Sequence, residues 1–409
     1  MPFTIASPTN STFPPINNSE KALKVLFFIP ANVDEVDIHH EFVTRLAHSL
    51  TDCVEADVVA SAEKSVCASL ADYDLLHIFG CWSKGGCALA DSAYELRVPY
   101  VITPLGMLQP WEMEKHRRGK LLLNKQRRIV ERATTINVCG KLEEQTFAKL
   151  GWNKRLSLIK NPVLTSQTTF DEVATRFCVL YRKVLDSTAR LRISMDAQAI
   201  IGNLLQFGVD RQLFGYANSE EALRKRLDEL VEEEWRRIFI YASDEQVDDL
   251  LKRALDGLCY EYPKFDIASF ERFDTQHPYK EGDLEGGTLL SHSLLMRNKV
   301  KDAFEACGKN EQRICVQLLN LSFELGHKMA PLRHLVNLYL AMRNTDMDED
   351  MVRSAARQLG IDDFAQRIMV VLADLLGLTE GFMPFVLRRD SKATLLSRDL
   401  TKFGVYKTY

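Results

Sequence analysis

Two loops that each follow a predicted strand carry the residue types best suited to bind a ligand. Gly80-Cys-Trp-Ser-Lys-Gly-Gly86 contains glycines that let backbone amides come close to a bound group. Thr103-Pro-Leu-Gly-Met-Leu-Gln-Pro-Trp111 combines prolines, which fix φ, with a glycine and an aromatic ring, so it is suited to line a pocket. Both segments also have structural interpretations, as a strand-to-helix turn and as a loop anchored by a buried tryptophan.

A basic stretch directly follows the second loop. Its cations are interspersed with leucines and other apolar residues, which predicts an amphipathic segment that attracts anionic lipid head groups or a phosphorylated ligand. A solvated helix face is the equal alternative. The net charge of the 409-residue chain is only −4, so such an attraction is local, and we expect no nucleic-acid binding. The cations assigned to the anionic contact are Lys115, Arg117, Arg118, Lys120, Arg127 and Arg128.

No other cluster of residues predicts catalysis. His327 and His334 are separated by Pro331, and no cysteine or carboxylate completes a metal set, so we expect no metal and no cofactor and assign no catalytic residue. The 9 cysteines form no Cys-x-x-Cys pair, which predicts free thiols in a reducing compartment. The first twenty residues lack a signal-peptide pattern, and the apolar stretch Met369–Leu378 is too short to cross a bilayer. These features predict a cytoplasmic protein.

The elements that position the two loops alternate regularly. Short apolar or β-branched runs, typical of strands covered on both faces, alternate with segments of helical periodicity. The predicted strands are Lys24–Pro30, Ala56–Ala60, Leu75–Phe79, Pro99–Thr103, Thr135–Val138 and Leu156–Ile159. This order predicts an α/β doubly wound, Rossmann-like sheet. The first strand is not followed by Gly-x-Gly-x-x-Gly, so the sheet does not resemble a dinucleotide-binding domain.

After Pro162 the strand-like runs disappear and helical periodicity takes over. Ser219 precedes an amphipathic stretch that reaches Tyr241, and Ser243-Asp-Glu-Gln246 has the pattern of a capping box that opens a further helix. We therefore expect a mostly α-helical second half. The predicted organisation is a disordered tail over residues 1–20, an α/β domain over 21–168 and a helical domain over 169–409, with a candidate division near 282–287.

Three segments resemble the N-terminal half of the family-four, GT-B type glycosyltransferases of surface polysaccharide synthesis. They are Leu76-His-Ile-Phe-Gly-Cys-Trp-Ser83, Pro99 to Trp111 and Leu158-Ile-Lys-Asn-Pro-Val163, and the similarity covers about residues 24–165. The resemblance implies an acceptor-binding Rossmann-like domain, followed by a hinge at Asn161 and Pro162 that leads into a second such domain. It implies an acceptor cleft lined by Gly80, Trp82, Ser83, Thr103, Gly106, Met107 and Trp111.

The chain also departs from this family. Leu105 stands where the family commonly has a histidine, and the second Rossmann-like half, with its two glutamates for the nucleotide sugar, is not found. Glu380-Gly-Phe382 is similar to the start of that glutamate motif, but the partner position is Arg388. We regard this three-residue match as a coincidence.

Two functions follow from the resemblance and its departures. The first is a glycosyltransferase-like protein of bacterial surface or capsular polysaccharide biosynthesis. It would be peripheral to the inner membrane face and, if active, would transfer a sugar from a nucleotide sugar to a glycan or lipid-linked acceptor. The second is a catalytically degenerate scaffold or binding module whose helical half docks a polysaccharide-synthesis protein.

Overall fold

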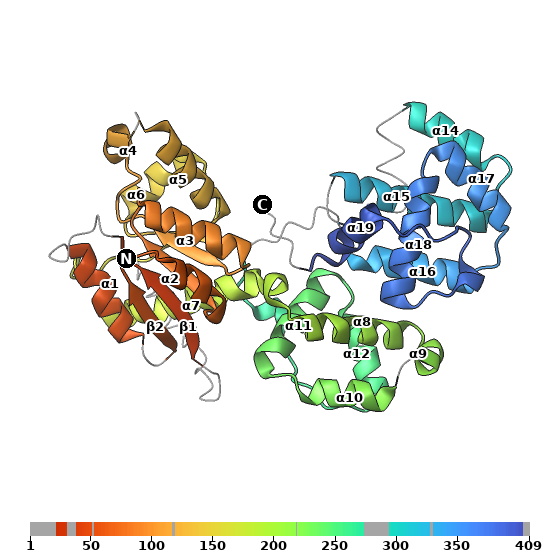
Figure 1. Cartoon of the computed structure of the whole chain (residues 1–409), viewed down its shortest axis with the longest axis horizontal. Coiled ribbons are helices and arrows are strands. Elements are labelled where there is room, and N and C mark those ends of the chain that lie inside the picture. Colours follow the sequence, from red (N-terminus) through yellow and green to blue (C-terminus); the bar gives the residue numbers. More distant parts are fainter. Residues whose placement is uncertain are drawn as a thin grey trace, which may run out of the picture.

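The N-terminal half of the protein is an α/β layer structure around one parallel sheet (Figure 1). The computed structural model describes residues 22–30, 38–50, 53–116, 119–217, 219–273, 294–327 and 330–403. The sheet has the strand order β2-β1-β3-β4-β5-β6, and every pair is parallel. The strands are β1 (Leu23–Phe28), β2 (Val54–Val59), β3 (Leu75–Phe79), β4 (Tyr100–Thr103), β5 (Thr135–Val138) and β6 (Leu156–Leu158). This confirms the predicted doubly wound, Rossmann-like sheet.

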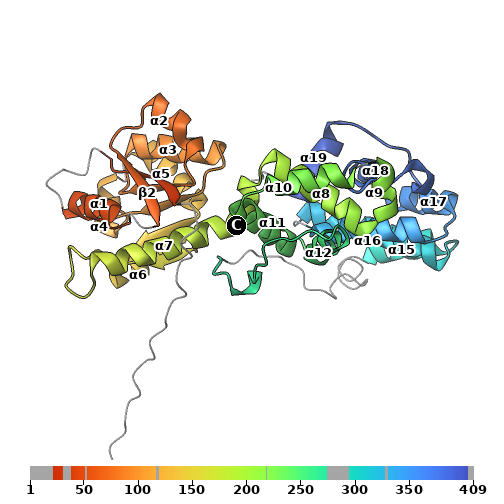
Figure 2. The same cartoon turned by 90° about the horizontal axis from the view of Figure 1, so that it is seen from below.

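Both faces of the sheet are covered by helices, which explains the continuous apolar runs of its strands. Alternate residues of one strand enter different cores, as Leu76 and Ile78 do on one face and Leu75 and Phe79 on the other. Figure 2 shows α7 (Phe170–Ser187) running along the side opposite α2 and α3. Helix α1 (Ile38–Ser49) shares the face of α7. The other face is covered by α2 (Lys64–Ser69), α3 (Lys84–Glu95), α5 (Lys120–Arg132) and α6 (Lys141–Leu150). The short helix α4 (Pro110–His116) precedes α5.

The second half is helical, as predicted. One continuous hydrophobic core runs from Ile193 to Leu400, and no residue described after β6 belongs to a strand. The predicted division near 282–287 and the predicted tail 1–20 lie outside the described residues. The helices are α8 (Met195–Val209), α9 (Arg211–Ala217), α10 (Glu220–Asp228), α11 (Glu232–Asp244), α12 (Asp248–Gly257), α14 (Leu294–Phe304), α15 (Lys309–His327), α16 (Leu332–Asn344), α17 (Glu349–Leu359), α18 (Asp362–Leu376) and α19 (Ser391–Thr401).

The predicted capping box at Ser243-Asp-Glu-Gln246 is wrong. Helix α11 continues through Ser243 to Asp244, and the next helix begins only at Asp248. Ser243 lies in the last turn of α11, and Gln246 has a left-handed backbone conformation with φ of +57°, so neither residue is placed to cap a new helix. The neighbouring Glu245 makes long-range contacts, because its carboxylate accepts a hydrogen bond from the backbone N–H of Leu332 at 2.9 Å and contacts the Lys402 ammonium.

The C-terminal end of the described chain is inserted into the helical core. Lys402 and Glu245 form an ion pair in which the two side chains are only 1% and 2% exposed. The Tyr241 hydroxyl donates to the carbonyl of Thr401 at 2.8 Å, and its ring stacks on that of Phe403 with 5.0 Å between centroids. Burial lowers the pKa of Lys402 and raises that of Glu245, so the mutual attraction offsets a large desolvation cost.

Helix α7 connects the two halves. It packs on the sheet through Val173, Phe177 and other residues, although the sequence assigned its range to the helical domain. Its last turns contact α11, because Arg182 pairs with Glu233 at 2.7 Å and Asp186 accepts two bonds from Arg236 at 2.8 and 2.7 Å. The boundary at 168/169 stays a prediction, but the packing places α7 on the α/β half.

The cysteines are not all free, in contrast to the expectation from their spacing. Cys53, just before β2, forms a disulfide with Cys178 of α7. The sequence separation of 125 residues explains why no local spacing indicates this pair. None of the helices among the described residues has the length and apolarity needed to span a membrane.

Candidate functional site

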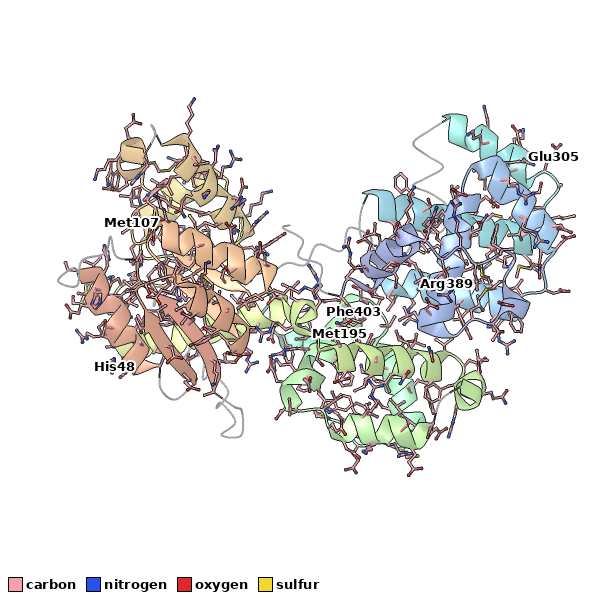
Figure 3. All side chains as sticks on the ribbon, viewed as in Figure 1. His48, Met107, Met195, Glu305, Arg389 and Phe403 are labelled. Carbon is pink, nitrogen blue, oxygen red and sulfur yellow. A yellow bond between two sulfur atoms is a disulfide. The ribbon has the colours of Figure 1, made fainter. Side chains whose placement is uncertain are left out.

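The two predicted loops meet at the carboxyl end of the sheet. Strand β1 lies between β2 and β3, so the order in which strands are added to the sheet reverses between β1 and β3. In open α/β sheets, ligands bind at such a switch point. The side chain of Met107, from the loop after β4, reaches this place. A Cβ atom on Gly80 would lie 3.3 Å from its sulfur and 3.4 Å from Cγ of Pro30, which follows β1. Figure 3 labels Met107 within the α/β half. The structure thus brings Gly80 and Met107 together.

Four residues of these loops have left-handed backbone conformations. The φ angles are +83° at Gly80, +63° at Trp82, +55° at Leu105 and +80° at Gly106. This region is costly for bulky side chains, so Trp82 and Leu105 are held there by their surroundings. Residues held in such conformations cluster at ligand-binding sites, which makes this loop pair the candidate site.

Trp82 connects the two loops. Its indole Nε1 donates to the carbonyl oxygen of Met107 at 2.7 Å, and its backbone N–H donates to Oε1 of Gln126 at 2.7 Å. The ring is nearly buried and stacks on His116 with 4.3 Å between centroids. The backbone N–H of Cys81 also donates to the Met107 sulfur at 3.2 Å. Trp82 therefore fixes the shape of the loops, and its indole N–H is already used.

Glu143, which the sequence reasoning missed, lies in the first turn of α6 and holds the second loop. Its Oε1 accepts from the backbone N–H of Gly106 at 2.7 Å, and its Oε2 accepts from that of Cys139 at 2.7 Å. Burial raises the pKa of Glu143, although these two bonds and the nearby His39 act in the opposite direction. The available signal was a glutamate in the first turn of the helix that follows a short strand.

Ser83 and Thr103 have structural contacts. The Ser83 hydroxyl caps α3 by accepting a backbone N–H at 3.3 Å. Thr103 is fully buried, and its hydroxyl lies 2.7 Å from Nε2 of His77 and 3.2 Å from the Asn137 amide. Nδ1 of His77 lies 2.7 Å from the Tyr181 hydroxyl, and burial holds the pKa of His77 well below its usual value. A role for Ser83 and Thr103 in a cleft stays a prediction, and the Thr103 side chain is enclosed.

Trp111 is the accessible aromatic residue of the predicted cleft. It is 57% exposed at the start of α4, so the interpretation of a buried tryptophan anchor is wrong. Nearby in sequence, Leu121 of α5 is 74% exposed. An exposed indole ring can pack against a ligand, whereas the Trp82 ring is already covered.

The basic stretch is partly neutralised. Arg117 and Arg118 lie outside the described residues, and Lys120 is exposed. Three of the assigned cations pair with carboxylates on helix surfaces: Lys115 with Glu112 at 2.6 Å, Arg127 with Glu131 at 2.7 Å and Arg128 with Asp91 at 2.5 Å. For these three residues the solvated-face interpretation fits the contacts.

The predicted hinge is a turn that leads into α7. Oδ1 of the buried Asn161 accepts from the backbone N–H of Val163 at 2.9 Å, and Pro162 lies between them. Thr169 and Glu172 then form a capping box at the start of α7. In the described residues this turn is not followed by a second Rossmann-like domain, in agreement with the predicted helical half, because the chain returns along the same sheet as α7 and continues as helices.

Neither the described residues nor the comparisons with known proteins assign a metal ion or a family. The described part of the chain contains no group of three or more His, Cys, Asp and Glu side chains that could hold a metal ion, and His334 is bonded to Glu324 at 2.8 Å. Comparisons with family models, with curated proteins and with solved structures each give no match. Function is therefore inferred from the geometry of the site and from the resemblance of the three segments.

Proposed function

We propose that this protein is a glycosyltransferase-like binding module of bacterial surface polysaccharide biosynthesis, without transferase activity. In this proposal the carboxyl end of the sheet binds a glycan or lipid-linked sugar, and the helical half docks a second protein of the same synthesis. The observation that carries the proposal is the helical core from Ile193 to Leu400, which occupies the part of the chain where the resemblance requires a nucleotide-binding sheet.

Leu105 supports the loss of catalysis. The family commonly has a histidine at this position, which can bond a sugar hydroxyl. Here the Leu105 side chain is nearly buried and packs in the core between the sheet and α7. The slot therefore offers no polar side-chain atom to a reacting sugar. A retaining transferase also needs charged groups for the leaving diphosphate, and the described residues of the helical half provide no second sheet to present them.

Binding is supported by the rigid form of the two loops. Two of the left-handed residues are fixed by hydrogen bonds that they donate: Trp82 to Gln126 and Met107, and Gly106 to Glu143. Little conformational entropy is therefore lost when a ligand binds. Trp111 supplies an exposed aromatic face. Such a ring can cover the apolar C–H face of a sugar.

Calorimetry tests the two parts of this proposal separately. We expect purified protein to bind none of a panel of UDP-, GDP- and dTDP-sugars, and to bind oligosaccharides or polyprenyl-phosphate sugars of the surface polysaccharide. Trp111→Ala should weaken glycan binding about tenfold, which corresponds to about 1.4 kcal/mol. Val386→Ala, at an exposed apolar residue of the helical half, is the matched control and should leave binding unchanged. Binding of a nucleotide sugar with release of the nucleoside diphosphate would overturn the proposal.

The helical half is tested by co-purification. We expect the full chain to form a stable complex with a second polysaccharide-synthesis protein. If the chain is recovered alone under mild extraction, the docking part of the proposal fails, while the calorimetric result still decides the ligand-binding part.

We also propose that the protein is cytoplasmic and that α4 and α5 lie on the inner membrane face. The exposed Trp111 and Leu121 stand on the same two helices as Lys115 and Lys120. An aromatic ring and an apolar side chain beside cations suit an anionic lipid interface. We expect the protein to co-sediment with phosphatidylglycerol vesicles but not with phosphatidylcholine vesicles. We expect Leu121→Glu to abolish the co-sedimentation. Equal binding to both kinds of vesicle would contradict the charge argument.

A further inference from the structure

The sheet has an open edge at β6. In its ladder with β5, the carbonyl of Arg155 accepts from Ile136 at 3.0 Å, and the N–H of Ile159 donates to Val138 at 3.1 Å. Peptide groups of alternate residues face alternate sides in a parallel strand. Those of Leu156 and Leu158 therefore point away from β5, and β6 is the last strand of the described sheet. Such an edge is a template for a further strand.

A groove of about 580 Å³ runs along this edge. Residues 156–159 form one wall, and Val179 and neighbouring residues of α7 form the other. Phe273 also lines the groove, and its backbone N–H donates to the Ser187 hydroxyl at 2.8 Å. The volume is within the range of sites that hold ligands of several hundred daltons, and the site therefore has room for a short peptide.

The helical wall of the groove is apolar in its centre and cationic on both sides. Val179 is 37% exposed and lies between Arg176 and Lys183 on the same face of α7. Neither cation forms an ion pair within 4.0 Å in the described part of the chain, and the Lys183 ammonium lies 4.7 Å above the Phe273 ring. Of the groove's two carboxylates, that of Glu172 accepts bonds from Thr168 and Thr169. The second carboxylate is that of Glu271, which precedes Phe273 by two residues in the sequence.

We propose that this groove binds an extended acidic peptide of a partner protein, which adds to β6 as a seventh strand. The peptide backbone bonds the free groups of Leu156 and Leu158. Alternate side chains of a strand point to the same side, so an apolar residue that contacts Val179 has neighbours two positions before and after that face Arg176 and Lys183. The recognised pattern is acidic-x-apolar-x-acidic.

The charges around β6 disfavour the β6 edge of a second copy of this chain as the occupant. Residues Lys154, Arg155 and Lys160 flank the strand, and Leu156-Ser-Leu158 itself carries no carboxylate. Pairing of two β6 edges would therefore bring cations against cations. A helix is also unsuitable, because its own hydrogen bonds already use the main-chain groups that β6 requires.

The test uses synthetic peptides and the full chain. The probe is fluorescein-labelled Thr-Glu-Thr-Val-Thr-Glu-Thr, followed by fluorescence anisotropy. One comparison peptide replaces both glutamates by lysines, and a second carries N-methyl groups on the residues that face β6. We expect each change to weaken binding at least tenfold, because one reverses the charges and the other removes the main-chain donors.

Charge reversal in the groove completes the test. Arg176→Glu and Lys183→Glu should weaken binding of the glutamate peptide about tenfold and improve binding of the lysine peptide, which loss of folding alone cannot produce. Lys64→Glu, an exposed lysine on the other side of the sheet, is the matched control and should change neither affinity. Absence of binding at millimolar peptide, equal binding of the N-methylated peptide, or a chain that dimerises through β6 in light scattering would each overturn the proposal.

Discussion

The buried ion pair between Lys402 and Glu245 gives the sharpest test of how the helical half is held together. Lys402→Met removes the ammonium but keeps most of the side-chain volume. Among the described residues, the Glu245 carboxylate, which is 2% exposed, then keeps only its bond from the Leu332 backbone at 2.9 Å. Breaking a buried pair by removing one partner costs about 3 to 5 kcal/mol, because an uncompensated carboxylate remains. We expect urea unfolding at pH 7.5 to show a loss of this size.

Two further variants and the pH dependence distinguish charge from packing. Lys252→Met removes an exposed i,i+4 partner of Asp248 and should cost less than about 1 kcal/mol. The double variant Glu245→Gln, Lys402→Met should recover part of the loss, because no charge remains buried. The pKa of Glu245 is raised by burial, so the single variant should lose stability as the pH rises from about 4.5 through the raised pKa. A Lys402→Met protein within about 1 kcal/mol of the parent would refute the reasoning.

Three other outcomes are expected. The pKa of His77 is lowered by burial, so below about pH 6.5 the unfolded chain takes up a proton that the folded protein does not. The free energy of unfolding should therefore fall by about 1.4 kcal/mol for each unit by which the pH is lowered. His77→Gln should remove this slope, whereas His48→Gln, at an exposed histidine, should not. Reduction of the Cys53–Cys178 disulfide should lower the free energy of unfolding by about 5 kcal/mol in urea titrations, because it opens a loop with a sequence separation of 125, and the effect of dithiothreitol should vanish in Cys178→Ser. Gly106→Ala should cost about 1 to 2 kcal/mol in thermal unfolding, since φ is +80° and a Cβ has open space; a neutral result would mean that the loop changes conformation freely.

The sheet was predictable because its signals are local. Runs such as Leu75-Leu-His-Ile-Phe79 are apolar on both faces and short, which indicates a covered strand whatever the rest of the chain does. The hydrogen bonds of His77 were not predictable. They depend on the registers that bring Thr103 of β4 and Asn137 of β5 into line on one face of the sheet, and on Tyr181 of α7, which is 104 residues away in sequence.

The candidate site was predictable in its loops but not in the roles of its residues. Sequence identified both tryptophans, yet the exposed ring is Trp111 and the covered ring is Trp82, whose N–H finds the Met107 carbonyl. Glu143 gave only a weak signal because its partners are backbone N–H groups of other segments. The role of Glu245 was not predictable for the same reason, since its partner Lys402 is 157 residues away.

Helix α7 serves two distant contacts at once. It has 18 residues, a stiff rod of about 27 Å, with Val179 in the groove wall and Arg182 and Asp186 against Glu233 and Arg236 of α11. Because one continuous helix carries both sets of contacts, we expect a rotation of α7 about its axis to move the groove wall and the ion pairs with α11 together.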